Sequence, residues 1–297
     1  MNPDPTLEEA ASRLDASDGY IVVRRLPKVT NYSSRAPIGE VRSALLVDVE
    51  STGLDTARDV IIEFGAVPFR YDSTGEVFDV GEPVSYFEDP GRPIPVDIVE
   101  LTGITDAMVA GQRIDDARVN ALLDESVLVI AHNASYDRRI LERRLPRFAE
   151  KHWGCSRDDV PWSRFGASGL KLQYLLYAVC RVFHDGHRAV DDCLATIHLL
   201  AAPRAADGRT PMAMLLDSAR RKTSRIWARK SAFETKEVLK ARGYRWNDAQ
   251  KTWFIDRPPA EVEAEKSWLQ ENVYAHSGVS LVDVTTFTAR ERYSVRA

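Results

Sequence analysis

Cysteine is scarce in this chain, and long apolar runs are lacking altogether. The three cysteines, Cys155, Cys180 and Cys193, are an odd number without a CxxC pair. Neither a disulfide framework nor a structural zinc site is therefore expected, and a reducing, cytoplasmic location is predicted. No apolar stretch approaches the roughly 20 residues that cross a bilayer, so no membrane partner is expected. The opening residues MNPDPTLEEA have neither the basic start nor the apolar core of a secretory signal.

The net charge of −4 hides an asymmetry along the chain. Residues 218–257 hold twelve Lys and Arg against four acids, a net charge of +8, so the remainder carries −12. A basic segment joined to an acidic domain suits an anionic partner such as nucleic acid. The alternative is that these cations only solvate an amphipathic helix, and charge alone does not separate the two.

Hydrophobic patterning predicts an α/β domain. Three strands with short polar links indicate an antiparallel meander, and a continuous apolar run at 127–131 indicates a strand buried on both faces. Strands followed by alternating helix and strand predict a mixed sheet with helices packed over it. The other predicted strands are 20–26, 44–49, 60–69 and 76–87, and the predicted helices are 6–15, 115–124, 136–145, 170–182 and 189–201.

The pattern breaks near Pro203, which predicts a second, small α+β domain. The helices predicted beyond this break are 212–221, 233–242 and 260–272, and the predicted strands are 224–228, 252–256 and 279–287. Gly243 is a suitable C-cap for the middle helix. The predicted division is an N-terminal extension, an α/β domain, a linker with the start of a helix, and a basic, aromatic-rich domain, at residues 1–42, 43–203, 204–217 and 218–297.

The first chemical signal is LLVDVESTGL, residues 45–54. On a strand, Asp48 and Glu50 point to the same face, although the strand otherwise has the pattern of core. Two adjacent carboxylates raise each other's pKa unless a cation lies between them, and their hard oxygens suit Mg²⁺ or Mn²⁺. The alternative is a strand that frays into a polar loop.

The second signal is IAHNASYDRRIL, residues 130–141. A buried strand ends at His132 and Asn133, and Asp137 lies in the first turns of the helix that follows. Taken alone, this acid is explained by the preference of helix N-termini for negative charge.

The third signal is GHRAVDD, residues 186–192. His187 precedes a helix on a turn that begins with Gly186, a position from which a histidine can exchange protons with its surroundings, and Asp192 follows five residues later. The alternative is an exposed histidine with acids that cap the helix. Spacing does not decide whether Asp191 or Asp192 faces a site.

Together these segments resemble the DEDD 3′–5′ exonucleases, in the histidine-containing branch that includes the proofreading epsilon subunit of bacterial DNA polymerase III. Its motifs match Asp-x-Glu-x-x-Gly at 48–53, His-Asn-Ala-x-x-Asp at 132–137, and His187 with Asp192, over roughly residues 43–203. A further family-like segment, LTGIT, occupies residues 101–105, and Ser51 departs from the more frequent Thr. The resemblance selects Asp192 over Asp191 and implies a ribonuclease H-like fold with a mixed five-stranded sheet flanked by helices.

The resemblance also implies a mechanism with two Mg²⁺ or Mn²⁺ ions and nucleoside 5′-monophosphates as products. Asp48 would bridge both ions, Glu50 and Asp192 would bind the ion nearer the nucleophile, and Asp137 would hold the other. His187 would be the general base. The 3′-terminal nucleotide would lie against the loop made by Ser51, Thr52, Gly53 and Leu54.

The remaining histidines and two cysteines are interpreted as structural. Cys180 and Cys193 lie on apolar helical faces and are expected in the core. The histidines interpreted in this way are His132, His152, His184, His198 and His276.

The basic C-terminal domain interleaves aromatic residues with cations. Rings can stack on bases while Lys and Arg meet phosphates, but a small domain also needs large side chains for its core. We expect most rings to pack and one or two to remain exposed. The candidate nucleic-acid-binding residues are Arg225, Arg229, Lys230, Lys240, Arg242, Arg245, Trp246 and Lys251.

The predicted function is exonucleolytic proofreading or repair, with DNA expected ahead of RNA as substrate and a DNA polymerase subunit as a candidate partner. One alternative is an exonuclease of RNA or oligoribonucleotides, since motifs do not reveal contacts to the 2′-OH. Another is a non-catalytic nucleic-acid-binding or polymerase-docking subunit, against which the intact five-residue set argues.

Overall fold

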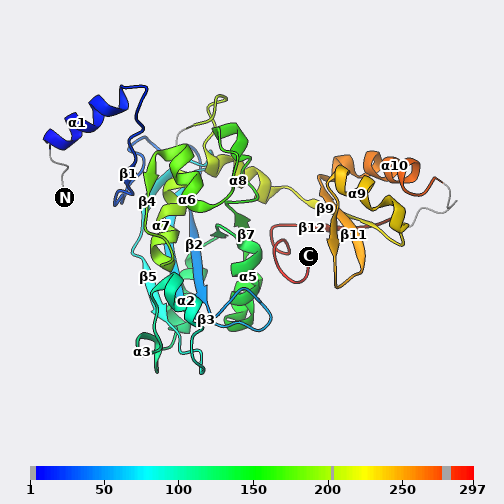
Figure 1. Cartoon of the computed structure of the whole chain (residues 1–297), viewed down its shortest axis with the longest axis horizontal. Coiled ribbons are helices and arrows are strands. Elements are labelled where there is room, and N and C mark those ends of the chain that lie inside the picture. Colours follow the sequence, from blue (N-terminus) through cyan, green and yellow to red (C-terminus); the bar gives the residue numbers. More distant parts are fainter. Residues whose placement is uncertain (1–4, 202–203, 276–281) are drawn as a thin grey trace. The chain divides into compact units, whose positions relative to one another are not determined.

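The computed structural model describes residues 5–201, 204–275 and 282–297 (Figure 1). The chain divides into two compact units, Met1–Ser218 and Ala219–Ala297. His276 and residues 279–281 of the last predicted strand lie outside the described residues.

The first unit is built on a mixed sheet. Its strand β2 (Arg42–Ser51) pairs antiparallel with β3 (Ile61–Tyr71) and parallel with β6 (Leu128–Ala131). On one side β6 pairs parallel with β7 (His152–Cys155), and on the other β3 pairs antiparallel with β4 (Val77–Val80) and β5 (Val84–Phe87). The mixed sheet flanked by helices is confirmed.

The sheet has six strands rather than the predicted five. The predicted strand 76–87 is two strands, which are separated by residues 81–83, where Pro83 has no N–H to donate. Strand β7 was not predicted: it is four residues long and shows no alternation.

Helices cover the sheet and position the later motifs. The helix α7 (Ala189–Leu200) packs on β2 and β3, and α5 (Ala134–Arg144) packs on β6, β7 and β2 (Figure 1). Gly65 on β3 permits the close approach of α7, since a Cβ there would lie 2.5 Å from the carbonyl carbon of Ala189. The other helical segments of the unit are α1 (Pro5–Asp15), α2 (Val96–Thr102), α3 (Asp106–Val109), α4 (Asp116–Glu125), η1 (Pro146–Glu150) and η2 (Trp162–Phe165).

Two predicted elements are shorter than expected. The helix predicted at 170–182 is one α-helical turn, α6 (Leu172–Leu175), followed by the π-helical η3 (Leu176–Cys180), and it ends where Arg181 takes a positive φ of 55°. The chain then extends as β8 (Val182–Phe183). The strand predicted at 20–26 is reduced to β1 (Arg24–Arg25), which pairs with β8.

The second unit is a four-stranded antiparallel sheet with helices. Its strands follow the order β10 (Arg245–Asn247), β11 (Thr252–Arg257), β9 (Thr223–Ala228) and β12 (Val282–Phe287). Its core includes Ile226, Ile255, Leu239 and Leu269. Its helical segments are η4 (Phe233–Thr235), α9 (Lys236–Arg242), η5 (Pro259–Glu261) and α10 (Val262–Asn272). The preceding helix α8 (Pro211–Arg220) belongs, up to Ser218, to the first unit. As predicted, Gly243 caps α9, with a φ of 97°.

None of the helices in the described part of the chain is long and apolar enough to cross a membrane.

Candidate active site

Three carboxylates from two distant segments converge at the end of β2. Asp48 and Glu50 lie two residues apart on this strand, and Asp192 lies in the first turn of α7. One ligand oxygen from each of the three lies within 4.8 Å of the other two. The arrangement therefore offers three hard oxygen ligands to one cation.

Asp137 opens onto the same cleft from α5, and its side chain is buried. The cleft has a volume of about 290 Å³. It is lined by Asp48, Val49, Glu50, His132, Asn133, Tyr136, Asp137, Lys171, Leu172, Gln173, His187 and Asp192. All four acids and the histidine that the sequence singled out thus line one cleft. Asp191 is exposed and does not line it, so the geometry agrees with the choice of Asp192.

Three acids of the cleft, Asp48, Glu50 and Asp137, have raised pKa values when no cation is present. Burial, together with the negative charges of Asp137, Asp192 and Glu50, holds the pKa of Asp48 well above its usual range. Burial and the nearby Asp192 and Glu63 raise the pKa of Glu50 to about 8. Burial raises the pKa of Asp137 to about 7. A cation in the cleft would relieve this repulsion, and the donor set therefore fits a divalent metal.

His187 lies where the chain turns into α7. It has a positive φ of 59°, and Gly186 before it also has a positive φ of 65°. The backbone N–H of His187 donates to Asp192 Oδ2 at 3.2 Å. This turn directs the imidazole into the cleft and holds one oxygen of Asp192.

The loop that follows β2 is held by hydrogen bonds within the chain. Ser51 Oγ donates to the Gly53 carbonyl oxygen at 2.7 Å and contacts the hydroxyl of Tyr136. The Thr52 N–H donates to the Val60 carbonyl oxygen at 3.0 Å, so it is already engaged. Leu54 is 88% exposed. Of the four substrate-binding candidates, Leu54 is the one whose side chain is available to a ligand.

Several residues of this region were not identified as site residues from the sequence. Tyr136 and Lys171 line the cleft, and the Tyr136 hydroxyl also donates to the Gly53 carbonyl oxygen at 2.7 Å. Tyr136 lies one residue before Asp137, within the second motif, and this position in the sequence could have identified it as a site residue. His132 agrees with its structural interpretation: burial lowers its pKa to about 4, and its ring nitrogens lie 2.8 Å from Ser156 Oγ and 2.9 Å from the Leu170 carbonyl oxygen.

His184 differs from its interpretation as a purely structural residue. Its Nε2 contacts Oδ1 of Asp192, and its side chain is only 5% exposed. No periodic pattern indicates this contact, because the two residues lie eight positions apart with a tight turn between them.

In the second unit, most of the candidate nucleic-acid-binding cations are paired with acids. Lys230 forms no ion pair within the described residues, and Trp246 is 46% exposed. As expected, most rings pack and few remain exposed: Phe233 is 80% exposed, whereas Trp227, Tyr244 and Phe254 are buried. The ion pairs are Arg225–Asp256, Arg229–Asp283, Lys240–Glu237, Arg242–Glu265, Arg245–Asp256 and Lys251–Asp248.

Comparison with known proteins places this site in a family. The RNase T model, described as Exonuclease, matches residues 45–200. The PolC-type DNA polymerase III of Clostridium perfringens is 33% identical over 189 residues, which is 62% of this chain and 12% of the polymerase. That of Halalkalibacterium halodurans is 36% identical over 167 residues, 52% of this chain and 11% of the polymerase. The chain thus matches about one eighth of the length of these relatives.

A solved structure agrees with the fold. The structure described as Exonuclease I (apo) superposes with a TM-score of 0.50 and 16% identity, over 84% of this chain and 63% of the other. At that identity the likeness supports the fold alone. The family model matches the chain from β2 to α7, the elements that carry the first and the last of the three motifs. On this evidence the chain belongs to the RNase T exonuclease family, within the DEDD superfamily.

Proposed function

We propose that this protein is a metal-dependent 3′–5′ exonuclease that releases nucleoside 5′-monophosphates from DNA. One observation carries the proposal: Asp48, Glu50 and Asp192, which lie up to 144 residues apart, bring ligand oxygens within 4.8 Å of one another. Asp137 and His187 line the same cleft. If these acids had no function, nothing would require four acids and a histidine from three separate motifs to line one cleft.

The acids are the proposed ligands of two Mg²⁺ or Mn²⁺ ions. Asp48, whose pKa is raised by burial and by the charges of Asp137, Asp192 and Glu50, would contact both ions. Glu50 and Asp192 would hold the ion nearer the nucleophile, and Asp137 would hold the other. When bound, such ions lower the pKa of a water and stabilise the leaving 3′ oxygen.

His187 is the proposed general base. Its imidazole lines the cleft beside Asp192, and histidine ordinarily titrates near neutral pH, as a base that accepts a proton from water requires. His184 does not line the cleft and is therefore not the candidate for this role.

The loop after β2 is the proposed site for the 3′-terminal nucleotide. The exposed Leu54 would pack against its base, and Ser51, Thr52 and Gly53 would shape the loop below it. Thr52 would support the loop from within, because its N–H donates to Val60 and its buried hydroxyl donates to Asp59 at 3.0 Å. Lys171, at the rim of the cleft, would meet a backbone phosphate.

DNA is the proposed substrate because the similar relatives are DNA polymerases. For the same reason a DNA polymerase subunit is the proposed partner. The alternative substrate is RNA, and the assay that tests the activity also distinguishes between the two substrates.

The test compares wild type and Asp48→Ala on 5′-labelled single-stranded DNA and RNA, with Mg²⁺, Mn²⁺ or EDTA. The expected result is a ladder that shortens from the 3′ end only with metal, at a rate at least about 10³-fold lower in the variant. Full activity of Asp48→Ala, or cleavage in EDTA, would refute the proposal. Binding without cleavage by both proteins would favour a non-catalytic nucleic-acid-binding subunit.

A further inference from the structure

His184 makes a contact that the proposed mechanism does not use. Its Nε2 lies against Oδ1 of Asp192, whereas Oδ2 of Asp192 accepts the N–H of His187 at 3.2 Å. Each oxygen of this carboxylate therefore has one partner from the turn before α7. A carboxylate held at both oxygens cannot rotate freely about its last side-chain bond.

The surroundings of His184 determine which ring nitrogen carries the proton. Nδ1 is buried and has no hydrogen-bond partner within the described residues. An N–H at that position would be left unsatisfied away from water, which is unfavourable. The proton therefore belongs on Nε2, and the imidazole donates to Asp192 Oδ1.

The segment that carries His184 is fixed by residues from the N-terminus of the chain. The Arg24 N–H donates to the Arg181 carbonyl oxygen at 3.0 Å, and the Leu26 N–H donates to the Phe183 carbonyl oxygen at 2.7 Å. Next to His184, Asp185 forms an ion pair with Arg25 at 2.7 Å. The turn is thus bound to the N-terminal segment of the chain.

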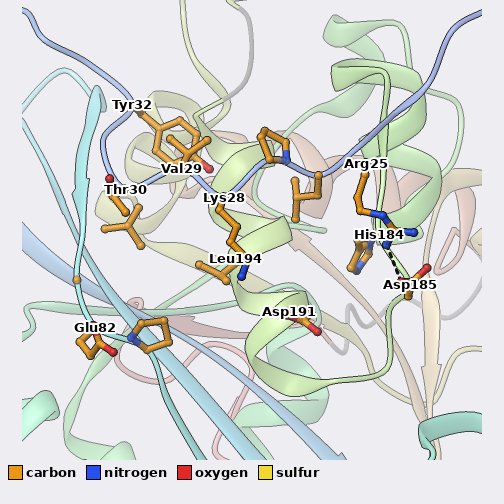
Figure 2. Close-up of a pocket in the computed structure, with 15 residues that line it drawn as sticks. Arg25, Lys28, Val29, Thr30, Tyr32, Glu82, His184, Asp185, Asp191 and Leu194 are labelled. Carbon is orange, nitrogen blue, oxygen red and sulfur yellow. Dashed lines mark hydrogen bonds and ion pairs between the residues drawn. The ribbon is translucent and has the colours of Figure 1, made fainter. Parts of the chain in front are cut away.

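Arg25, Leu26, His184 and Asp185 line a second pocket, of about 500 Å³ (Figure 2). Figure 2 shows Arg25, His184 and Asp185 gathered at one end of it, with the chain from Arg25 to Tyr32 passing over the pocket. The position of His184 therefore depends on the N-terminal segment as well as on the family domain.

We propose that His184 is a positioning residue that orients Asp192 as a metal ligand. The inference rests on the proposed function, because it assigns a partner to one of the proposed ligands. Ligating carboxylates are commonly held by such outer hydrogen bonds, whose loss lowers metal affinity. His184 acts through Asp192 and needs no contact with the substrate.

The experiment measures Mn²⁺ binding by electron paramagnetic resonance, without nucleic acid, in the full chain. The variants are His184→Ala, which removes the donor, and His184→Gln, whose amide nitrogen can take the place of Nε2. His198→Ala is the matched control, since His198 is a partly buried histidine of α7 that contacts Tyr32 rather than an acid of the cleft. Circular dichroism and thermal melting establish that each variant is folded.

We expect His184→Ala to weaken Mn²⁺ binding by about 10- to 100-fold. His184→Gln should recover most of the affinity, and His198→Ala should remain within about twofold of wild type. Unchanged affinity in a folded His184→Ala would overturn the inference, and tighter binding would show that His184 competes with the metal. If His184→Ala does not fold, unchanged binding by His184→Asn, whose shorter side chain does not reach Asp192, overturns it equally.

The outcomes separate the two proposals. A wild-type protein that binds no Mn²⁺, or binds it equally well after Asp48→Ala, contradicts the proposed function itself. A wild type that binds Mn²⁺ through Asp48 but is indifferent to residue 184 contradicts only the role of His184.

Discussion

The guanidinium of Arg188 covers the buried carboxylate of Glu63. Its Nε and terminal nitrogen donate to the two carboxylate oxygens at 3.1 and 2.8 Å. The same carboxylate accepts the Ala189 N–H at 3.2 Å, and Glu63 lies opposite Glu50 in the β2–β3 ladder. The first turn of α7, which carries Asp192, is therefore fastened to the strand beside the first motif.

We expect Arg188→Ala to lower the free energy of unfolding by about 1–3 kcal/mol, because it leaves the buried Glu63 carboxylate without its charged partner. The value stays within this range because the Arg188 side chain is 44% exposed, so that water can replace part of the interaction. Turnover should also fall, since α7 loses an anchor near Asp192. Urea denaturation and single-turnover cleavage measure the two effects.

Arg147→Ala provides the control for Arg188→Ala. Arg147 pairs with Asp124, and both side chains are largely solvated, at 40% and 63% exposure. Its replacement should change stability by less than about 1 kcal/mol and leave turnover unaltered. Equal effects of the two substitutions would show that Arg188 does not anchor α7.

Gly65 gives a second test of how α7 is placed. An added methyl group would lie 2.5 Å from the Ala189 carbonyl carbon and 2.6 Å from the Val190 nitrogen, and backbone cannot move aside cheaply. We expect Gly65→Ala to cost about 1–3 kcal/mol of stability and to reduce turnover. Gly19→Ala, whose nearest neighbour would be a hydroxyl 4.0 Å away, should be neutral. A neutral Gly65→Ala in denaturation would mean that α7 does not pack this closely.

Strong periodic signals predicted the elements that carry the site. The strand with Asp48 and Glu50 and the helix with Asp192 have long apolar patterns, and both form as expected, as β2 and α7. The short strands β7 and β10 were missed because four- and three-residue segments, HWGC and RWN, are too brief to show alternation. Their structure comes from the neighbouring strands with which they pair.

Contacts across turns were beyond prediction from the sequence. The contact of His184 with Asp192 depends on a tight turn at Gly186 and His187, where both residues take positive φ. The pairing of β1 with β8 joins segments about 158 residues apart, and no local pattern in either segment specifies the other. The site acids were recognisable as motifs, whereas the residues that hold them in place were not.

The raised pKa values in the cleft predict how pH affects the metal-free protein. Burial and neighbouring acids raise the pKa of Glu50 to about 8, and burial raises that of Asp137 to about 7. A carboxyl whose folded pKa lies above its unfolded value binds protons more tightly when folded. Its contribution to stability is complete below about pH 4 and is lost as the pH rises through about 7 to 8. In EDTA, the melting temperature should therefore fall over this range.

Thermal melts in EDTA and in Mn²⁺ check this pH dependence. Mn²⁺ should restore stability at about pH 8, where the acids are ionised, and have little effect at about pH 5, where protons compete. The Asp48→Asn, Glu50→Gln double variant should lose part of the pH dependence, because it lacks two of the titrating groups. A double variant that parallels wild type at every pH would contradict the assignment.

We expect the second unit to contribute to the binding of long DNA but not to the cleavage reaction. Among the candidate nucleic-acid-binding residues, Lys230 forms no ion pair within the described residues and the ring of Trp246 is half-exposed, so these two side chains can meet a phosphate and a base. Lys230→Glu with Trp246→Ala should weaken binding of long single-stranded DNA by about tenfold and flatten its salt dependence. Lys266→Glu is the control, because Lys266 is already paired with Glu263.

Removal of Ala219–Ala297 should have the same effect on long DNA and leave cleavage of a short oligonucleotide intact, since the acids of the cleft all belong to the first unit. Fluorescence anisotropy at several salt concentrations and a short-substrate assay measure the two properties side by side. Unchanged DNA affinity after the truncation would mean that the cations of this unit serve its own ion pairs. In that case the second unit would be a candidate for docking another protein, and the pull-down of a DNA polymerase with and without it becomes the decisive comparison.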